Sequence, residues 1–115
     1  VYTFGPTFRA ENSNTSRHLA EFWMIEPEIA FYDIEDNMDL AEDFVKYLIN
    51  YVLENYPDDI AFLDQRIKDL EKNMKLEDRR PMGLLDTLRF VVDNNFERIT
   101  YTEAVELILN SKEYK

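Results

Sequence analysis

The spacing of apolar residues changes near residue 34, and this change constrains the fold more than any other feature of the chain. Before it, aromatic and β-branched residues alternate with polar ones, which is typical of strands. After it, apolar residues recur every three or four positions, which is typical of amphipathic helices. We therefore expect an α+β fold in two parts, a β-hairpin over residues 1–34 and about four helices over residues 35–115.

The first part reads as two extended arms joined by a polar loop. Residues 1–8 form the first arm, where Gly5 and Pro6 favour an irregular or edge position. Residues 9–18 contain only one apolar residue, an alanine, which is typical of a loop. Residues 22–34 alternate between two faces and predict the second arm. Together these segments predict a long antiparallel hairpin.

The second part predicts helices separated by polar breaks. Polar and helix-breaking residues mark the expected boundaries, namely Asp39 before the first helix, Pro57 after it, Asp58 or Asp59 as the cap of the second, residues 72–81 as a connector, Gly83 and Asn94 around the third, and Thr100 before the fourth. Thr100 and Glu103 have the spacing of a capping box, in which each side chain accepts a hydrogen bond from the other residue's backbone.

Charge and composition exclude several classes of function. The formal net charge of −11 makes the chain a poor general nucleic-acid binder, because an acidic surface repels phosphate. Any RNA contact would have to be local and basic, and residues 9–18 are the only such place early in the chain. There is no cysteine, which excludes disulfides and thiolate metal sites and fits a reducing, cytoplasmic location. No apolar run approaches the length of a membrane span.

The two ends of the sequence suggest a longer natural chain. The sequence opens on Val1 without an initiator Met and without the pattern of a signal peptide, inside a segment that reads as a strand. We therefore expect further residues on the N-terminal side. A helical pattern reaches almost to Lys115, so we expect a truncation at that end as well.

One group of polar and aromatic residues in the hairpin carries the chemical interest. Arg9 and Glu11 are two residues apart, so on a strand their side chains share one face. Arg17 and His18 return from the loop with positive charge, and Phe22 opens the second arm with an aromatic face. An arginine for phosphate, a carboxylate for an amino group and a ring for stacking are what a nucleotide requires.

A structural role remains an alternative for the same residues. Arg9 could form a cross-strand ion pair with Glu11 or Glu21 over an ordinary aromatic core, and composition alone favours this interpretation. One of the two neighbours Phe22 and Trp23 is expected in such a core, because successive strand residues face opposite ways. The acidic cluster that follows the hairpin is interpreted as a solvated turn and helix N-terminus rather than a metal site. Its members are Asp33, Glu35, Asp36, Asp39, Glu42 and Asp43.

The order and spacing of these residues favour the nucleotide interpretation. Residues 8–23 read FRAENSNTSRHLAEFW, and an apolar strand follows them. This run resembles motif 2 of the class II aminoacyl-tRNA synthetases, in the form found in the asparaginyl-tRNA synthetases. Residues 1–34 would then be the motif 2 hairpin of the catalytic domain. Residues 35–115, including the segment at 99–104, resemble the helical region that follows it in bacterial asparagine enzymes.

The resemblance implies a role for seven residues of the hairpin. They are Arg9 on the ATP α-phosphate and the amino acid carboxylate, Glu11 near the adenine amino group, Arg17 and His18 on the β- and γ-phosphates, Leu19 beside them, Phe22 stacked on adenine, and Glu26 on the α-amino group of the substrate. Arg9 would be the catalytic residue among them, because it neutralises charge that develops at phosphorus.

The reaction implied has two steps. ATP and asparagine give an adenylate and pyrophosphate, and the acyl group then moves to the asparagine tRNA. Mg²⁺ would assist the first step, held mainly by residues outside this chain, and we assign no metal ligand within it. The full-length enzyme is expected to be a homodimer. We expect no association with a membrane. Motif 1, motif 3 and an anticodon-binding barrel are not found in the sequence, so we expect the chain alone to be inactive.

Two other functions remain open from the sequence. An aspartyl-tRNA synthetase, or a related enzyme that makes asparagine without tRNA, would carry a similar hairpin, because selection of the substrate side chain depends on residues outside this run. A non-catalytic module is the alternative of another class, in which the helices bind a protein partner and the hairpin is vestigial. Loss of the nucleotide site is disfavoured by the presence of Arg9, Glu11, Arg17, His18 and Phe22.

Overall fold

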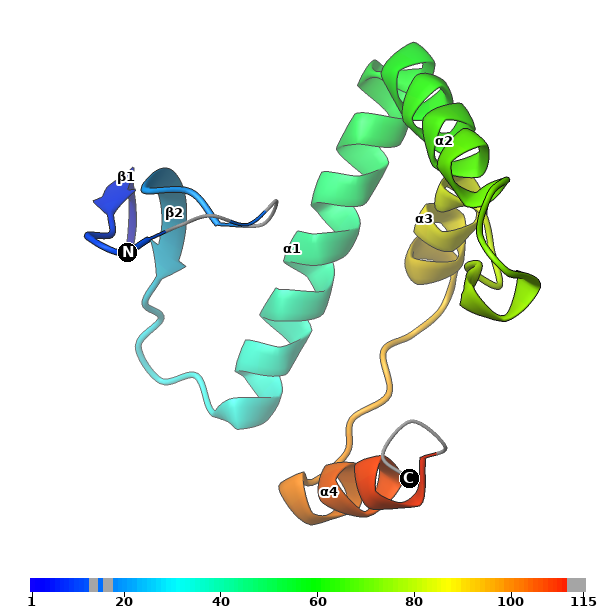
Figure 1. The fold of residues 1–115 in the computed structure, drawn as a ribbon. Helices are drawn as coiled ribbons and strands as arrows, with labels where there is room; N and C mark the ends of the chain where they lie inside the picture. The colour runs from blue at the N-terminus through cyan, green and yellow to red at the C-terminus, as the bar shows by residue number, and fades with distance from the viewer. Residues whose placement is uncertain (13–14, 16–17, 112–115) are drawn as a thin grey trace. The chain divides into compact units, whose positions relative to one another are not determined.

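The computed structural model describes residues 1–12, 15 and 18–111. The chain forms two compact units, Val1–Met38 and Asp39–Lys115, each treated separately below. The elements follow one another as β1 (Tyr2–Phe8), β2 (Glu21–Pro27), α1 (Ile34–Asn55), α2 (Pro57–Glu71), the short 3₁₀ helix η1 (Leu76–Asp78), α3 (Leu84–Asp93) and α4 (Tyr101–Asn110), as Figure 1 shows. The predicted α+β fold, a hairpin followed by four α-helices, is confirmed.

The hairpin is a two-stranded antiparallel sheet. Its register runs from Tyr2 opposite Pro27 to Phe8 opposite Glu21. Backbone hydrogen bonds from Glu28 N to Val1 O (2.8 Å) and from Arg9 N to Ala20 O (2.9 Å) extend the pairing beyond both ends. Because hydrogen-bonded and non-hydrogen-bonded pairs alternate, Pro6 occupies a non-hydrogen-bonded position and its missing N–H costs no ladder bond. The strand therefore continues through Gly5 and Pro6.

The second strand is shorter than predicted. The sequence predicts an arm over residues 22–34, but β2 ends at Pro27. Val1 pairs with Glu28, so the register offers the following residues no partner within this chain. A turn follows instead, in which Phe31 has a φ of 70°, a left-handed conformation that is uncommon for a bulky residue.

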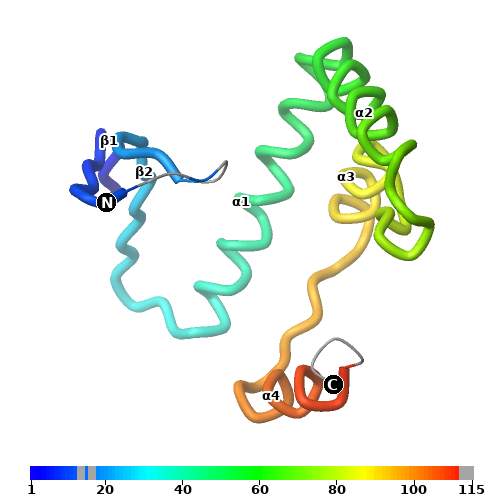
Figure 2. Tube along the Cα trace, viewed as in Figure 1, coloured from blue at the N-terminus to red at the C-terminus, as the bar shows by residue number. Residues whose placement is uncertain are grey.

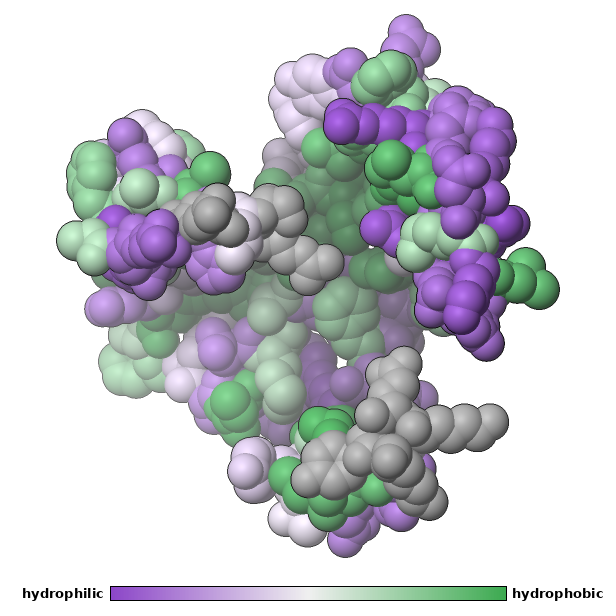
Figure 3. Space-filling model, viewed as in Figure 1, coloured by the Kyte–Doolittle hydropathy of each residue, from purple (hydrophilic) through white to green (hydrophobic). Residues whose placement is uncertain are grey.

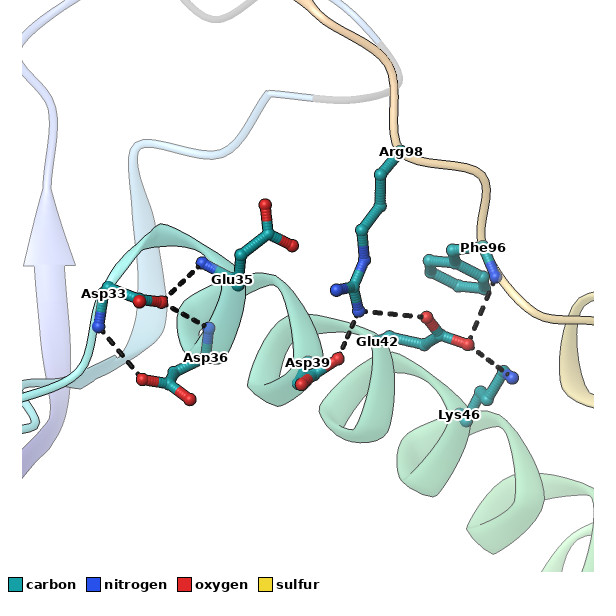
Figure 4. A network of polar contacts seen from close by, with 8 residues as sticks. All are labelled: Asp33, Glu35, Asp36, Asp39, Glu42, Lys46, Phe96 and Arg98. Carbon is teal, nitrogen blue, oxygen red and sulfur yellow. Dashed lines mark hydrogen bonds and ion pairs between the residues drawn. The ribbon is translucent and has the colours of Figure 1, made fainter.

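The first helix begins five residues earlier than the expected boundary at Asp39. Asp33 Oδ1 accepts hydrogen bonds from the backbone N–H groups of Glu35 (2.9 Å) and Asp36 (3.1 Å), and Asp36 Oδ2 accepts one from Asp33 N (3.1 Å), as Figure 4 shows. This reciprocal pattern is that of a capping box, here with aspartate at both positions. It satisfies the first N–H groups of α1, and the helix starts at Ile34.

The other helix boundaries follow the sequence more closely. The cap at Thr100 is confirmed, because its side chain accepts from Glu103 N and the Glu103 carboxylate accepts from Thr100 N. Gly83 and Asn94 flank α3 as expected. The prediction that an aspartate caps α2 is wrong, because Tyr56 holds that position and Pro57 takes the first helical position, where its lack of an N–H costs nothing. An extended stretch joins α3 to α4 (Figure 2).

The described residues contain no buried hydrophobic side chain. Contacts between elements join β1 to β2 and α2 to α3. Apolar residues consequently reach the surface, as the green areas of Figure 3 show. No helix within the described part of the chain is long and apolar enough to cross a membrane. A hydrophobic face left open in this way is normally covered by other protein.

Asp64 fixes the contact between α2 and α3. It is the one buried charged residue in the described part of the chain, with 8% of its surface exposed. Its Oδ2 lies 2.6 Å from Lys68 Nζ, and its Oδ1 accepts a hydrogen bond from Leu85 N at 3.3 Å. The Lys68 ammonium and the Leu85 amide lower the pKa of this carboxyl from its ordinary 3.8. Asp64 therefore caps the N-terminus of α3 from a neighbouring helix.

Replacing Asp64 with asparagine is expected to lower the Tm of the whole protein more at pH 6 than at pH 3. A carboxyl whose folded pKa is lowered contributes stability above its unfolded pKa of 3.8, and this contribution is lost as the pH falls through the folded value. Thermal unfolding at both pH values measures the difference. Asp69→Asn is the control, because Asp69 pairs with Lys72 in an exposed position where solvent screens the charge. An equal Tm difference at both pH values would contradict the assignment.

Candidate functional site

The hairpin has two faces of different character. The first is the face of Arg9, defined by the alternation of the strands and by the register, and its members are Thr3, Gly5, Thr7, Arg9, Ala20, Phe22, Met24 and Glu26. The opposite face carries Tyr2, Phe4, Phe8, Trp23 and Ile25. Phe4 and Trp23 contact each other there, with ring centroids 5.0 Å apart, and Trp23 is 60% exposed. Phe22 is half-buried on the face of Arg9, so the rings of Phe22 and Trp23 lie on different faces.

Arg9 and Phe22 lie in direct contact. The centre of the Arg9 guanidinium lies 5.5 Å from the centroid of the Phe22 ring, within the range of a cation–π interaction. Arg9 Nη1 also donates to Phe8 O at 3.3 Å. The cross-strand ion pair of Arg9 with Glu21 that the sequence left open is not formed among the described residues. The structure therefore brings together two residues predicted to bind a nucleotide.

Glu26 lies on the same face as Phe22, four residues further along β2. Its Oε2 accepts a hydrogen bond from Thr3 Oγ1 at 3.1 Å, and Thr3 is its cross-strand partner. The rise of a strand separates Glu26 from Phe22 by about 13 Å along the sheet. Sequence reasoning missed Thr3, although its spacing of two and four residues from Gly5 and Thr7 places all three on one face.

The expected alignment of Arg9 and Glu11 on one strand face is wrong. β1 ends at Phe8, and Glu11 lies in a bend beyond it, because the hairpin pairing stops at the backbone bond from Arg9 to Ala20. Glu11 is exposed there. Arg17, which the sequence also predicts in this site, lies outside the described residues.

The two remaining predicted residues lie where the loop returns to β2. His18 is exposed, and its Nδ1 lies 2.5 Å from Thr15 Oγ1, so a hydrogen bond holds the imidazole against the loop. Leu19 is 67% exposed. Both residues precede β2 on the side where Arg9 leaves β1, but no hydrogen bond or ring contact joins either side chain to the side chain of Arg9 or Phe22 in the described part of the chain.

The acidic cluster after the hairpin serves the structure of α1 and its neighbours. Arg98 forms ion pairs with Asp39 and with Glu42, the latter at 3.9 Å (Figure 4). Glu42 also lies 2.7 Å from Lys46 Nζ and accepts from Phe96 N at 3.2 Å. The hydrogen bond from Lys46 lowers the pKa of Glu42 most, and the hydrogen bond from the Phe96 amide lowers it further. No group of three or more metal-binding side chains exists among the described residues.

Comparison with known proteins relates the whole chain to one family. The family model described as "tRNA synthetases class II (D, K and N)" matches residues 1–115. An asparagine–tRNA ligase of Cytophaga hutchinsonii is 56% identical over 118 residues, which cover 100% of this chain and 23% of that protein. Those of Alkaliphilus oremlandii and a Nostoc species are 52% and 55% identical, over 98% and 94% of this chain. The chain spans less than a quarter of the length of these relatives.

Proposed function

This chain belongs to the class II tRNA synthetases of the D, K and N group, and from that premise we propose that it supplies part of the ATP site of an asparagine–tRNA ligase. The observation that carries the proposal is the contact of Arg9 with Phe22 on one face of the hairpin. A guanidinium and an aromatic ring at this separation offer the phosphate grip and the base platform that a nucleotide requires.

Binding of ATP would replace the contact between Arg9 and Phe22 by a contact of each residue with the nucleotide. The guanidinium of Arg9 now lies over the Phe22 ring, a contact worth about 0.5–1 kcal/mol at an exposed site. A hydrogen bond from a guanidinium to a charged phosphate contributes more, about 1.5–3 kcal/mol. In the proposed complex, adenine takes the place of the guanidinium on the ring, and Arg9 turns to the α-phosphate and the substrate carboxylate. There it stabilises the charge that develops as the carboxylate attacks phosphorus.

The other predicted residues have roles at the two ends of the substrates. Glu26 would receive the α-ammonium group of asparagine, with Thr3 orienting its carboxylate. Arg17 and His18 would hold the β- and γ-phosphates, as the family pattern implies. Glu11 would lie near the adenine amino group and the loop that touches tRNA, and Leu19 would lie beside Arg17 and His18. Mg²⁺ would add positive charge to the phosphates when bound, and we assign its ligands to none of the described residues.

The lack of buried hydrophobic side chains among the described residues supports a place within a larger catalytic domain. The aromatic face of Phe4 and Trp23 remains exposed, as does much of the apolar surface of the helices. The chain also spans only about a fifth of the relatives that it matches. We propose that the whole protein provides the covering surface and the rest of the active site, acts as a homodimer in the cytoplasm, and charges the asparagine tRNA.

The decisive measurement is amino-acid-dependent exchange of pyrophosphate into ATP. The whole protein is expected to support this exchange with asparagine and to charge the asparagine tRNA. The 115-residue chain alone is expected to do neither, because its site lacks the groups that the rest of the domain would supply. Exchange with aspartate in place of asparagine would favour the aspartyl alternative. Charging of tRNA by the isolated chain would contradict the proposal that it holds only part of the site.

A further inference from the structure

Gly5 occupies a position in β1 where a glycine is unfavourable. It is one of two glycines in the chain and lies in the middle of the strand, opposite Met24. Glycine in a strand interior loses more conformational freedom on folding than other residues and offers no side chain for packing. Such a glycine is normally explained by a special backbone conformation or by something that approaches it closely.

Neither the backbone nor the packing of this chain explains Gly5. No described glycine has a positive φ, so the conformation of Gly5 is open to any residue. A Cβ atom added to Gly5 would meet no heavy atom of the described residues within 4 Å. The space above this residue is therefore open within the described part of the chain, although Gly5 itself is half-buried between its neighbours.

The open space lies on the face that carries the proposed site. The register places Gly5 and Met24 midway between two cross-strand pairs, Thr7 with Phe22 and Thr3 with Glu26. At the rise of a strand, Gly5 lies about 7 Å along the sheet from each of these pairs. A ligand with its base on Phe22 and its ammonium group at Glu26 must therefore pass over Gly5.

We propose that Gly5 keeps a passage open for the middle of the bound substrates, where the nucleotide phosphate and the amino acid carboxylate meet. The inference rests on the proposed function and adds to it a position at which side-chain size limits binding. A methyl or isopropyl group here would project into the passage from the floor of the face of Arg9.

The experiment replaces Gly5 with alanine and with valine in the whole protein. Valine is expected to raise the KM for ATP and for asparagine in pyrophosphate exchange about tenfold. This is the order of the loss in binding that one extra methylene group causes in a closely fitting pocket. Alanine should raise both by a smaller factor. The Tm should stay unchanged or rise in both variants. The strand conformation of Gly5 suits either side chain, and replacing glycine reduces the conformational entropy of the unfolded chain.

The other glycine supplies a matched control with the opposite expectation. A Cβ atom on Gly83 would lie 3.1 Å from Asp64 Oδ1 and 3.6 Å from Lys68 Cε. Asp64 is held by Lys68 and by the Leu85 amide, so it cannot withdraw without loss of these bonds. Gly83→Ala should therefore lower the Tm and leave both KM values unchanged.

Three results would count against the inference, and they are distinguishable. Wild-type KM values in Gly5→Val would overturn it while leaving the proposed function intact. A KM increase accompanied by a fall in Tm would also overturn it, because the space would then hold another part of the protein rather than substrate. If the wild-type protein lacks asparagine-dependent exchange, the proposed function fails and this inference fails with it. Raised KM values at an undiminished Tm, with the reverse pattern in Gly83→Ala, would support it.

Discussion

Replacing Arg9 with alanine in the whole protein is expected to slow asparagine-dependent pyrophosphate exchange by about 10²–10³-fold, the usual cost of removing one group that stabilises developing charge in a transition state. The fold of the hairpin should survive the change. Among the described residues, the Arg9 side chain contacts its neighbour Phe8 O and the Phe22 ring, whereas the strand pairing uses the Arg9 backbone N–H, which alanine retains. The Tm should therefore change little while the rate falls.

Whether Arg9→Ala changes kcat or KM of pyrophosphate exchange identifies the role of Arg9. An arginine that acts mainly in the transition state lowers kcat and kcat/KM together, whereas one that only holds ATP raises KM and leaves kcat unchanged. Arg9→Lys is the companion variant, because it keeps the positive charge but loses the planar fork that grips phosphate and carboxylate together. We expect it to recover part of the rate. Exchange at the wild-type rate in Arg9→Ala would remove Arg9 from the site.

Local chemistry allowed much of the fold to be predicted from the sequence. The capping box of Thr100 and Glu103 depends on two residues three positions apart, and the structure forms it. The hairpin follows from two β-forming arms around a polar loop. The helix α1 starts earlier than predicted because Asp33 and Asp36 cap it at the end of a segment whose alternation is typical of a strand. An aspartate at the third helical position accepts the same bond as the usual glutamate.

Long-range pairing could not be predicted in the same way. The ion pairs of Arg98 with Asp39 and Glu42 join residues more than fifty positions apart, and no local pattern indicates them. The division of Phe22 and Trp23 between two faces was expected, but which ring would share its face with Arg9 depends on the register of β1 against β2. That register also places Gly5 and Thr3 beside the site, and residue type alone does not mark either as functional.

Replacing Phe22 with alanine is expected to weaken ATP binding by about 10- to 100-fold, because stacking of a base on an aromatic side chain contributes about 1–3 kcal/mol. The variant should raise the KM for ATP more than the KM for asparagine, since the ring lies far from Glu26 at the other end of the face. Phe22→Tyr keeps the ring and should bind ATP nearly as the wild type does.

Trp23→Ala is the matched control for this prediction, because Trp23 is the next residue on the same strand and carries a larger ring on the opposite face. Its ring contacts Phe4, so its loss should affect the stability of the hairpin rather than the KM for ATP. A rise in that KM for Trp23→Ala, with none for Phe22→Ala, would mean that the nucleotide binds the aromatic face instead. The contact of Arg9 with Phe22 would then be a structural cation–π pair, and the phosphate grip would have to be sought on the other side of the hairpin.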